Sequence, residues 1–489
     1  MKLNNNNLVE LKGAILPSYD RDDLSAGILH IGLGNFHRAH QAWYLHRLMQ
    51  QRIDLDWAIV GAGVRSSDEQ MRVKLAQQDF LTSLIELDPK STVVEIVGSM
   101  IDFVPVNPRN QTLIERMVQN DIRIVSLTVT ESGYFLDGPS KGFNASHIDI
   151  IHDVAYPQQP VTCFGAIIEA LRQRRQHGLG PFTIMSCDNL LGNGDITKQT
   201  VLSLARLQDA ELADWIEHQV TFPNSMVDCI VPATGPQEMQ LITELGIDDQ
   251  APVTHEPYRQ WVIEDNFCAG RPQWEKVGVT ITENVHAYET MKLRILNGGH
   301  QVIAAAGDLI GIETIAGCMS DAKISGLFFA VEQEIAPHVP AVPEFTPQAY
   351  IELIAQRFAN SKIFDTTRRV AYDGSSRQPG FLMDSIRDSL KLHTGVNGLA
   401  LVSAIWARYC QGVREDGSKI KPNDPHWSLL CEIALRAKTT PIVWLENVDV
   451  YGNLAENKEF SNAFCQWLEM INSQGLILTI NNFLPAKAC

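Results

Sequence analysis

The chain has 489 residues, 45% hydrophobic and 20% charged, which is typical of a folded globular protein of roughly two to four domains. Its 57 acidic residues outnumber its 40 basic ones, and the net charge of −17 disfavours general binding to nucleic acid or to anionic membranes. The nine cysteines form no C-x-x-C pair, which argues against a zinc ribbon, and no run approaches the ~18 apolar residues of a membrane helix. The N-terminus, MKLNNNNLVELKG, lacks the apolar core of a signal peptide, so we expect a cytoplasmic protein.

Short apolar segments alternate with helical patterns over the first part of the chain. Strands are predicted at 28–32, 57–61, 93–98, 123–130, 182–187 and 227–231, and helices at 37–50, 111–119, 161–177 and 198–207. The strand segments are β-branched and apolar on both faces, as in a parallel sheet that is covered on both sides. We therefore predict an α/β fold whose residues 1–284 form a doubly wound, Rossmann-type dinucleotide-binding domain.

The pattern changes near residue 285, where long helical periodicities replace the strand signals. Helices are predicted at 287–309, 320–336, 347–359, 381–391, 397–412, 426–436 and 457–474. Residues 285–489 are therefore predicted to form a second, mostly α-helical domain, and the polar side chains on its first helix, described below, mark it as the substrate and catalytic domain.

A glycine turn follows the first predicted strand. Gly32 and Gly34 form a G-x-G motif between that strand and a helix, where backbone N–H groups can face a pyrophosphate. The third glycine of the fingerprint is absent, since position 37 is His. After the next strand, Asp68 would favour NAD through the ribose hydroxyls, whereas Arg65 would favour NADP, and the sequence leaves both open with NAD ahead.

A polar cluster is predicted on the first long helix of the second domain. In an α-helix Asn297 lies about 140° around from Lys292, and His300 about 80°, so the three share one broad side. Gly298 and Gly299 disfavour a helix interior, and we interpret them as allowing close approach of a ligand. Asn189 follows a predicted strand at the sheet edge where ligands bind, although an Asx turn would explain it equally well.

Several segments resemble the mannitol dehydrogenase family, a group of NAD(P)-dependent polyol dehydrogenases and reductases that includes hexuronate reductases. Five of them, in chain order, are GLGNFHRAHQA, TVTESGY, CDNLLGNG, FPNSMVDCIVPAT and MKLRILNGGHQVIA. The segments DTTRRVAYDGSSRQPGF and LALVSAIWARYCQGVREDG resemble the family's C-terminal domain. The resemblance runs in order from about residue 25 to residue 455.

The resemblance implies a role for each matching residue. Lys292 corresponds to a general base that works without a metal, Asn189 and Asn297 to donors that hold the reacting oxygen, His300 to a residue that orients the substrate, and Glu289 to a proton-exchanging carboxylate. The implied substrate-binding residues are Val227, Asp228, Arg369 and Arg377, and the implied cofactor-binding residues are Gly32, Gly34, Asn35, Phe36, Asp68 and Glu131. Arg377 stands where the family often has Lys, and Cys229 where it has Arg.

The implied reaction is the oxidation of D-mannitol by NAD to D-fructose, with NADP not excluded. A hexuronate (fructuronate or tagaturonate) reductase is the alternative within the family, with Arg369 and Arg377 available for a carboxylate. A non-catalytic NAD-binding regulator is an alternative of another class. A zinc alcohol dehydrogenase is disfavoured because no Cys/His ligand spacing is present. The expected partners are a polyol and its ketose, and the resemblance favours a monomer.

Overall fold

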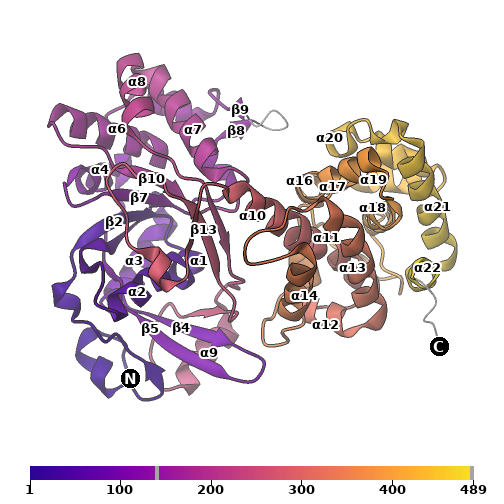
Figure 1. Cartoon of the computed structure of the whole chain (residues 1–489), viewed down its shortest axis with the longest axis horizontal. Helices are drawn as coiled ribbons and strands as arrows, with labels where there is room; N and C mark the ends of the chain where they lie inside the picture. The colour runs from indigo at the N-terminus through magenta and orange to yellow at the C-terminus, as the bar shows by residue number, and fades with distance from the viewer. Residues whose placement is uncertain (138–141, 485–489) are drawn as a thin grey trace. The chain divides into compact units, whose positions relative to one another are not determined.

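The computed structural model describes residues 1–137 and 142–484, which form two compact units, Met1–His286 and Ala287–Cys489 (Figure 1). The domain boundary that we predict after residue 284 falls directly before helix α10, Val285–Met291. The first unit contains the described sheets, and the second is built from helices.

A five-stranded sheet lies at the centre of the first unit. All its neighbouring strands are parallel, in the order β10-β7-β2-β3-β6. The strands are β2 (Ala26–Ile31), β3 (Ala58–Ala62), β6 (Met100–Phe103), β7 (Ile124–Leu127) and β10 (Thr183–Ser186). Their carboxyl ends lie along one edge, which is the edge where nucleotides bind in sheets of this kind.

Hydrophobic cores cover both faces of this sheet. The consecutive residues Ile28 and Leu29 of β2 are fully buried and enter different cores, because successive strand side chains point to opposite faces. Leu29 packs in the core that contains Leu113 of α4 and Ile167 of α6, and Ile28 packs in the core that contains Leu45 of α2. The sheet is therefore doubly wound, and the predicted Rossmann-type fold class is confirmed.

Two of the six predicted strands belong to other sheets. β5 (Thr92–Val97) lies in a sheet of order β1-β5-β4-β12, with β1 (Ala14–Ile15), β4 (Thr82–Leu87) and β12 (Val253–His255). β11 (Ser225–Asp228) pairs antiparallel with β13 (Gln260–Glu264), which pairs with β14 (Thr280–Thr282), and β8 (Leu136–Asp137) pairs with β9 (Gly142–Phe143). A buried apolar strand has the same sequence pattern in any sheet, so this pattern does not identify the strands with which it pairs.

The helix predicted at 37–50 is broken at His40, whose φ of −119° and ψ of −91° separate α1 from α2. The helices of the first unit are α1 (Asn35–Ala39), α2 (Gln41–Gln50), α3 (Ser66–Ala76), α4 (Gln111–Val118), α5 (Ile148–Ala155), α6 (Cys163–Gln176), α7 (Asn193–Gln208), α8 (Ala210–Gln219) and α9 (Pro236–Glu244).

His37 occupies the position of the third glycine of the fingerprint, and its ring fills the space that a glycine there would leave empty. The rings of His37 in α1 and His30 in β2 stack with their centroids 3.4 Å apart and an interplanar angle of 15°, and both side chains are fully buried. His30 places Nδ1 2.8 Å from Ser126 Oγ and Nε2 2.9 Å from Thr128 Oγ1. Burial lowers the pKa of His30 to about 3 and the pKa of His37 well below its ordinary value.

Because both rings are buried in the neutral form, we expect the free energy of unfolding to fall as the pH is lowered. The neutral rings stabilise the folded state fully above the unfolded-state pKa of about 6.5, and below it the unfolded chain takes up protons that the folded chain excludes. Each ring is then expected to remove up to about 1.4 kcal/mol of unfolding free energy per pH unit. His37→Phe keeps a stacked ring that cannot be protonated, so it should lose less stability on acidification.

The measurement is urea unfolding of both proteins at about pH 7.5 and 5.5. His218→Phe serves as a control because His218 is exposed, and its stability should follow that of the wild type. An unchanged pH dependence in His37→Phe would exclude this explanation.

The second unit is a helical domain, as predicted. Helix α10 (Val285–Met291) begins two residues before this unit. The helices that follow are α11 (Gly298–Leu309), α12 (Ile315–Ser320), α13 (Ala322–Ile335), α14 (Pro347–Phe358), α15 (Thr367–Val370), α16 (Gly374–Phe381), α17 (Met383–Leu392), α18 (Asn397–Tyr409), α19 (Trp427–Ala437), α20 (Val448–Tyr451), α21 (Lys458–Gln474) and α22 (Leu476–Phe483). A π-helical segment, η7 (Lys292–Asn297), joins α10 to α11. Within the described part of the chain, no helix combines the length and hydropathy needed to cross a membrane.

Candidate active site

The glycine turn after β2 has the geometry that a dinucleotide requires. Gly32 has a φ of +95°, and a Cβ atom placed on it would lie 2.1 Å from the carbonyl oxygen of Thr128. A Cβ on the exposed Gly34 would meet only the Gly32 carbonyl oxygen, at 3.9 Å. The first glycine thus permits the tight turn and the second leaves backbone open to a ligand, so the turn fits a pyrophosphate.

The side chains of Asn35 and Phe36 hold the turn in place. Asn35 donates to Thr234 Oγ1 at 2.9 Å and to the Pro232 carbonyl at 3.2 Å, which ties the turn to the loop after β11. The half-buried ring of Phe36 stacks on that of His40 with centroids 4.9 Å apart.

Asp68 has a local role in the structure. Its Oδ2 accepts the backbone N–H groups of Val64 and Arg65, at 3.0 and 2.9 Å, and so caps the start of α3. A Cβ atom on Gly63 would lie 2.2 Å from Asp68 Cβ, so the carboxylate is seated against the backbone after β3. This geometry explains an acid at position 68 without a ribose, and its contact with the cofactor stays a prediction.

A buried carboxylate, Asp188, joins the loops that carry Glu131 and Asn189. It accepts the N–H groups of Val129 and Thr130, at 3.0 and 2.9 Å, and the hydroxyl of Tyr134 at 2.7 Å. Burial raises the pKa of Asp188, and these hydrogen bonds oppose that shift. Thr130 has a φ of +66°, a strained conformation for a β-branched residue, and the two loop N–H bonds hold it there. Glu131 and Asn189 are both exposed beside this anchor.

Sequence reasoning assigned no role to Asp188, because its partners lie about sixty residues away.

Val227 and Asp228 end strand β11 opposite Trp261 and Gln260 of β13, and both are 4% exposed. Cys229 directly follows them and is also buried.

The predicted catalytic residues of the second unit begin at the end of α10. Glu289, Lys292 and Asn297 are 5%, 7% and 8% exposed. The Nδ2 atom of Asn297 is buried and has no hydrogen-bond partner among the residues that the structure describes. The predicted single α-helix over 287–309 is wrong in its middle, since 292–297 is π-helical. The 140° separation between Lys292 and Asn297 therefore does not apply.

His300 lies one turn further along, in α11. Its ring stacks on Phe358 of α14, with centroids 4.1 Å apart and an interplanar angle of 12°. Its Nε2 atom is buried without a hydrogen-bond partner among the described residues. Burial lowers the pKa of His300 to about 3, and the nearby guanidinium groups of Arg369 and Arg377 act in the same direction. The imidazole is therefore neutral near pH 7.

The two predicted substrate arginines lie near His300 but have different partners. Arg369 forms a forked pair with Asp365, at 2.6 Å from Nε and 2.5 Å from Nη2, and this raises the pKa of Arg369. Arg377 donates from Nη1 to the Val370 carbonyl at 2.7 Å.

The paired glycines of α11 have a packing role, which corrects the expectation that a ligand approaches them. A Cβ on Gly299 would lie 2.6 Å from the Phe328 ring and 3.0 Å from Glu332 of α13. A Cβ on Gly298 would lie 3.4 Å from the Leu382 side chain. Both positions therefore face protein, and Gly299 allows α13 to pack closely against α11.

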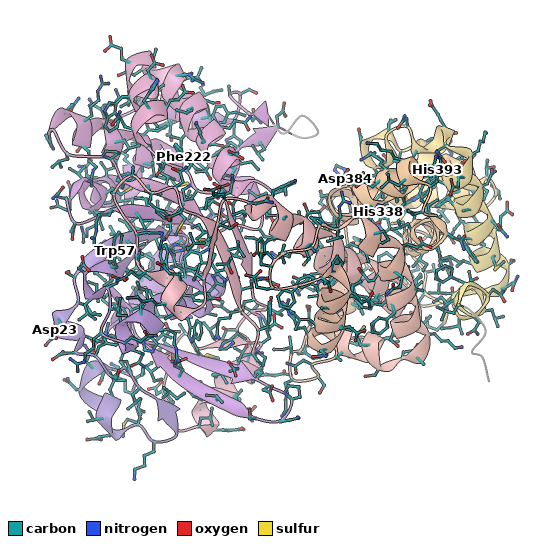
Figure 2. The ribbon with its side chains drawn as sticks, viewed as in Figure 1. Asp23, Trp57, Phe222, His338, Asp384 and His393 are labelled. Carbon is teal, nitrogen blue, oxygen red and sulfur yellow. The ribbon has the colours of Figure 1, made fainter. Side chains whose placement is uncertain are left out.

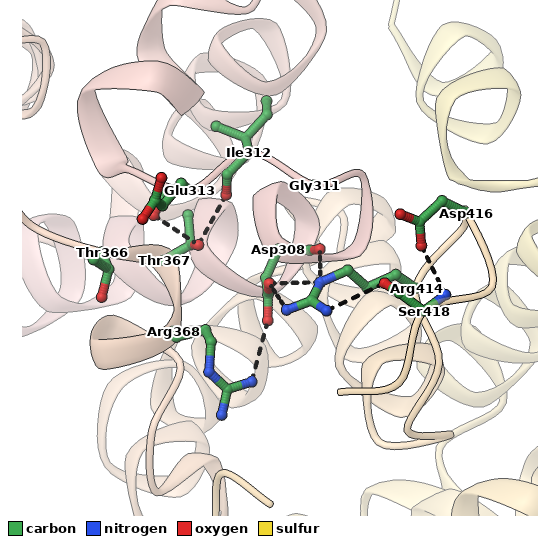
Figure 3. A pocket seen from close by; sticks show the side chains of 10 residues that line it. All are labelled: Asp308, Gly311, Ile312, Glu313, Thr366, Thr367, Arg368, Arg414, Asp416 and Ser418. Atoms are coloured by element: carbon green, nitrogen blue, oxygen red, sulfur yellow. Dashed lines mark hydrogen bonds and ion pairs between the residues drawn. The ribbon is translucent and has the colours of Figure 1, made fainter. Parts of the chain in front are cut away.

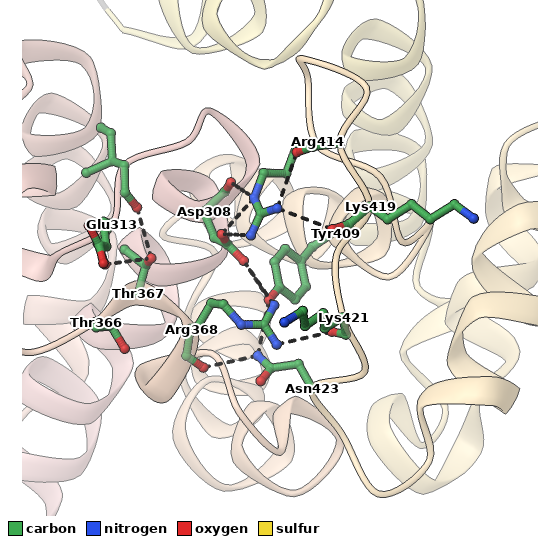
Figure 4. Close-up of polar contacts among 12 residues, drawn as sticks. Asp308, Glu313, Thr366, Thr367, Arg368, Tyr409, Arg414, Lys419, Lys421 and Asn423 are labelled. Carbon is green, nitrogen blue, oxygen red and sulfur yellow. Dashed lines mark hydrogen bonds and ion pairs between the residues drawn. The ribbon is translucent and has the colours of Figure 1, made fainter.

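A cavity of about 410 Å³ lies at the other end of α11, where the sequence indicated nothing (Figure 3). The buried Asp308 accepts Arg414 at 2.7 Å from Nη2 and 2.9 Å from Nε, and Tyr409 Oη at 2.9 Å. Arg368 Nη1 lies 3.8 Å from the same carboxylate (Figure 4). This Asp308 cluster joins α11, α15, α18 and the loop that follows α18. Among the described residues, no group of three or more His, Cys, Asp or Glu side chains could hold a metal ion.

Comparisons with known proteins match both units. The Mannitol dehydrogenase Rossmann domain matches residues 26–276, and the Mannitol dehydrogenase C-terminal domain matches residues 284–472. A mannitol 2-dehydrogenase of Cereibacter sphaeroides is 52% identical over 471 residues, which cover 96% of this chain and 98% of that protein.

Two solved structures resemble the whole chain. One is the Pseudomonas fluorescens mannitol 2-dehydrogenase in ternary complex with NAD and D-mannitol, with 40% identity, a TM-score of 0.88 and coverage of 99% of each chain. The other is a D-sorbitol dehydrogenase in substrate-free form, with 30% identity, a TM-score of 0.89 and coverage of 98% of this chain and 100% of that one. With both domains matched and relatives similar over nearly its full length, this chain belongs to the mannitol dehydrogenase family.

Proposed function

We propose that the chain is a metal-independent, NAD-dependent polyol dehydrogenase that oxidises D-mannitol to D-fructose. The observation that carries the proposal is that two buried residues, Lys292 and Asn297, lie in the same π-helical segment. The Nδ2 atom of Asn297 has no hydrogen-bond partner among the described residues. The 52% identity to a mannitol 2-dehydrogenase and the similarity to a complex with NAD and D-mannitol support this substrate and cofactor.

The residues of the first unit are proposed to bind the cofactor. Gly32 and Gly34 would receive the pyrophosphate, with Asn35 and Phe36 beside them and Glu131 after β7. Asp68 is proposed to favour NAD over NADP. Bound NAD supplies the hydride acceptor, which no side chain can replace.

Lys292 is proposed as the general base that takes the proton from the substrate hydroxyl. Lys292 is buried, and burial disfavours the ammonium form of an amine, which suits a group proposed to accept a proton. Asn297 Nδ2 and Asn189 are proposed to donate to the developing negative oxygen, an effect of about 2–4 kcal/mol per donor. Glu289, three residues before Lys292, is proposed to exchange the proton with solvent.

Substrate orientation is assigned to the remaining residues. A neutral His300 can offer Nε2 as a donor or an acceptor to a hydroxyl group, depending on its tautomer. Val227, Asp228, Arg369 and Arg377 are proposed to contact the polyol. The forked pair of Arg369 with Asp365 favours a neutral polyol over a hexuronate, because a substrate carboxylate would compete with this ion pair.

A substrate panel tests the proposal. We expect NADH oxidation with D-fructose to be at least about tenfold faster than with fructuronate, and NAD to be preferred over NADP in D-mannitol oxidation. The rate of each reaction is measured from the absorbance of the reduced cofactor. Faster turnover of fructuronate would identify a hexuronate reductase, and NAD binding without turnover on any polyol would identify a regulator.

A cytoplasmic location and a monomeric state complete the proposal. The odd number of cysteines, nine, suits a reducing compartment. Cell fractionation and light scattering of the purified chain would measure the two properties.

A further inference from the structure

The helix that contains Lys292 and Asn297 is formed by α10, η7 and α11, and its hydrogen-bond pattern changes over the six residues of η7. Between α10 and α11 the segment η7, Lys292–Asn297, is π-helical, and the Gly298 N–H donates to the Leu293 carbonyl five residues earlier. The residues on either side, Met291 and Gly298, keep α-helical backbone angles, with φ/ψ of −60°/−49° and −58°/−50°. The π turn is therefore a local widening inside one continuous helix, and it accommodates more residues than an α-helical turn does.

This widening changes which side chains share a face. In an α-helix Lys292 and Asn297 would point about 140° apart. In a π-helix, residues i and i+5 are joined by one hydrogen-bonded turn, so the two side chains leave the helix on the same side. Both are buried, and Asn297 Nδ2 has no hydrogen-bond partner among the described residues.

Packing around the segment holds the turn in this form. Arg294, inside the turn, forms an ion pair with Asp388 of α17 at 2.7 Å and donates to the His338 carbonyl at 3.0 Å. The His338 ring, labelled in Figure 2, is in turn 2.9 Å from Thr394 Oγ1. Just after the turn, Gly299 fits against Phe328 with no space for a Cβ atom. π turns are rare and often occur at functional sites, so one that is held from inside by Arg294 and just after its end by the packing of Gly299 requires a reason.

We propose that this π turn is a positioning device, which brings the amine of Lys292 and the amide of Asn297 into register on one helix face. The inference rests on the proposed function, since it assigns these two groups to one reacting oxygen. Lys292 and Asn297 are the catalytic residues, and the turn itself acts only through them.

Two single-residue deletions test the register, because each shortens the helix by one residue and lets the π turn become α-helical. Deleting Leu293 leaves Lys292 and Asn297 four residues apart, about 40° around an α-helix. Deleting Thr290 leaves them five residues apart, about 140° around. Leu293 and Thr290 are both half-buried.

The Leu293 deletion is expected to keep turnover within about tenfold of wild type, and the Thr290 deletion to lose at least about 100-fold with NAD binding intact. Equal losses in the two folded deletion variants would overturn the inference. An inactive wild type would instead overturn the proposed function.

A second pair of variants gives a readout that is independent of activity and of deletion. In a His300→Ala background, which removes a neighbouring imidazole, Lys292→His together with Asn297→His is titrated with Ni²⁺. Imidazoles on one face of a helix chelate a metal ion jointly, so Ni²⁺ should bind at least about tenfold more tightly than to either single-histidine variant. Affinity equal to that of the single variants would place the two positions on different faces and overturn the inference.

Discussion

The Lys292→Ala variant is expected to bind NAD as the wild type does, while its turnover with D-mannitol falls at least about 100-fold. The amine of Lys292 is the proposed acceptor of the hydroxyl proton, and alanine leaves no base in its place. The N-terminal unit that carries the glycine turn is unaltered, so cofactor affinity should be retained. Turnover follows from absorbance of NADH, and cofactor binding from quenching of tryptophan fluorescence.

Two further variants separate a missing base from a missing charge. Lys292→Arg keeps a cation but stays protonated at all accessible pH values, so it should lose as much turnover as Lys292→Ala. Lys323→Ala, at an exposed position of α13 in the same unit, should behave as wild type. Near-normal turnover in Lys292→Ala would reject Lys292 as the base.

The largest effect on stability is expected from Asp308→Ala, with a loss of roughly 3–5 kcal/mol. Asp308 is 4% exposed, and its carboxylate accepts hydrogen bonds from two nitrogens of Arg414 and from the hydroxyl of Tyr409 (Figure 4). Removing it leaves a mostly buried guanidinium without its counterion. For a unit of this size the melting temperature should fall by roughly 10 °C, which calorimetry can measure.

The same cavity provides a matched control. Asp416 is exposed, and Asp416→Ala should leave the melting temperature unchanged. Combining Asp308→Ala with Arg414→Met removes both charges and should recover part of the loss. If the melting temperatures of Asp308→Ala and Asp416→Ala are equal, the Asp308 cluster does not stabilise the second unit.

Much of the framework follows from local sequence patterns. The strands β2, β3, β7 and β10 are short, apolar and followed by turn residues, so their parallel sheet could be predicted. The placement of Lys292, Asn297 and His300 on the first helical stretch of the second unit could be predicted as well. The roles of the individual site residues remain predictions.

The features that sequence reasoning missed depend on distant partners or on backbone hydrogen bonding. Asp188 is one of two adjacent turn-forming residues in the sequence, and its loop-joining role needs Thr130, which only the fold brings near. Gly299 indicates a close approach, but the approaching group is Phe328 from the next long helix. The π turn shifts the hydrogen bond from i→i+4 to i→i+5, and side-chain spacing alone does not reveal this shift.

The stacked imidazoles under the glycine turn have a consequence for recognising nucleotide-binding proteins. A genome screen that requires three glycines would discard this chain, although its sheet, turn and second glycine meet the physical requirements. Restoring the missing glycine by His37→Gly would match the consensus and yet leave a void as large as an imidazole ring against β2. In this fold the consensus residue would be the damaging one.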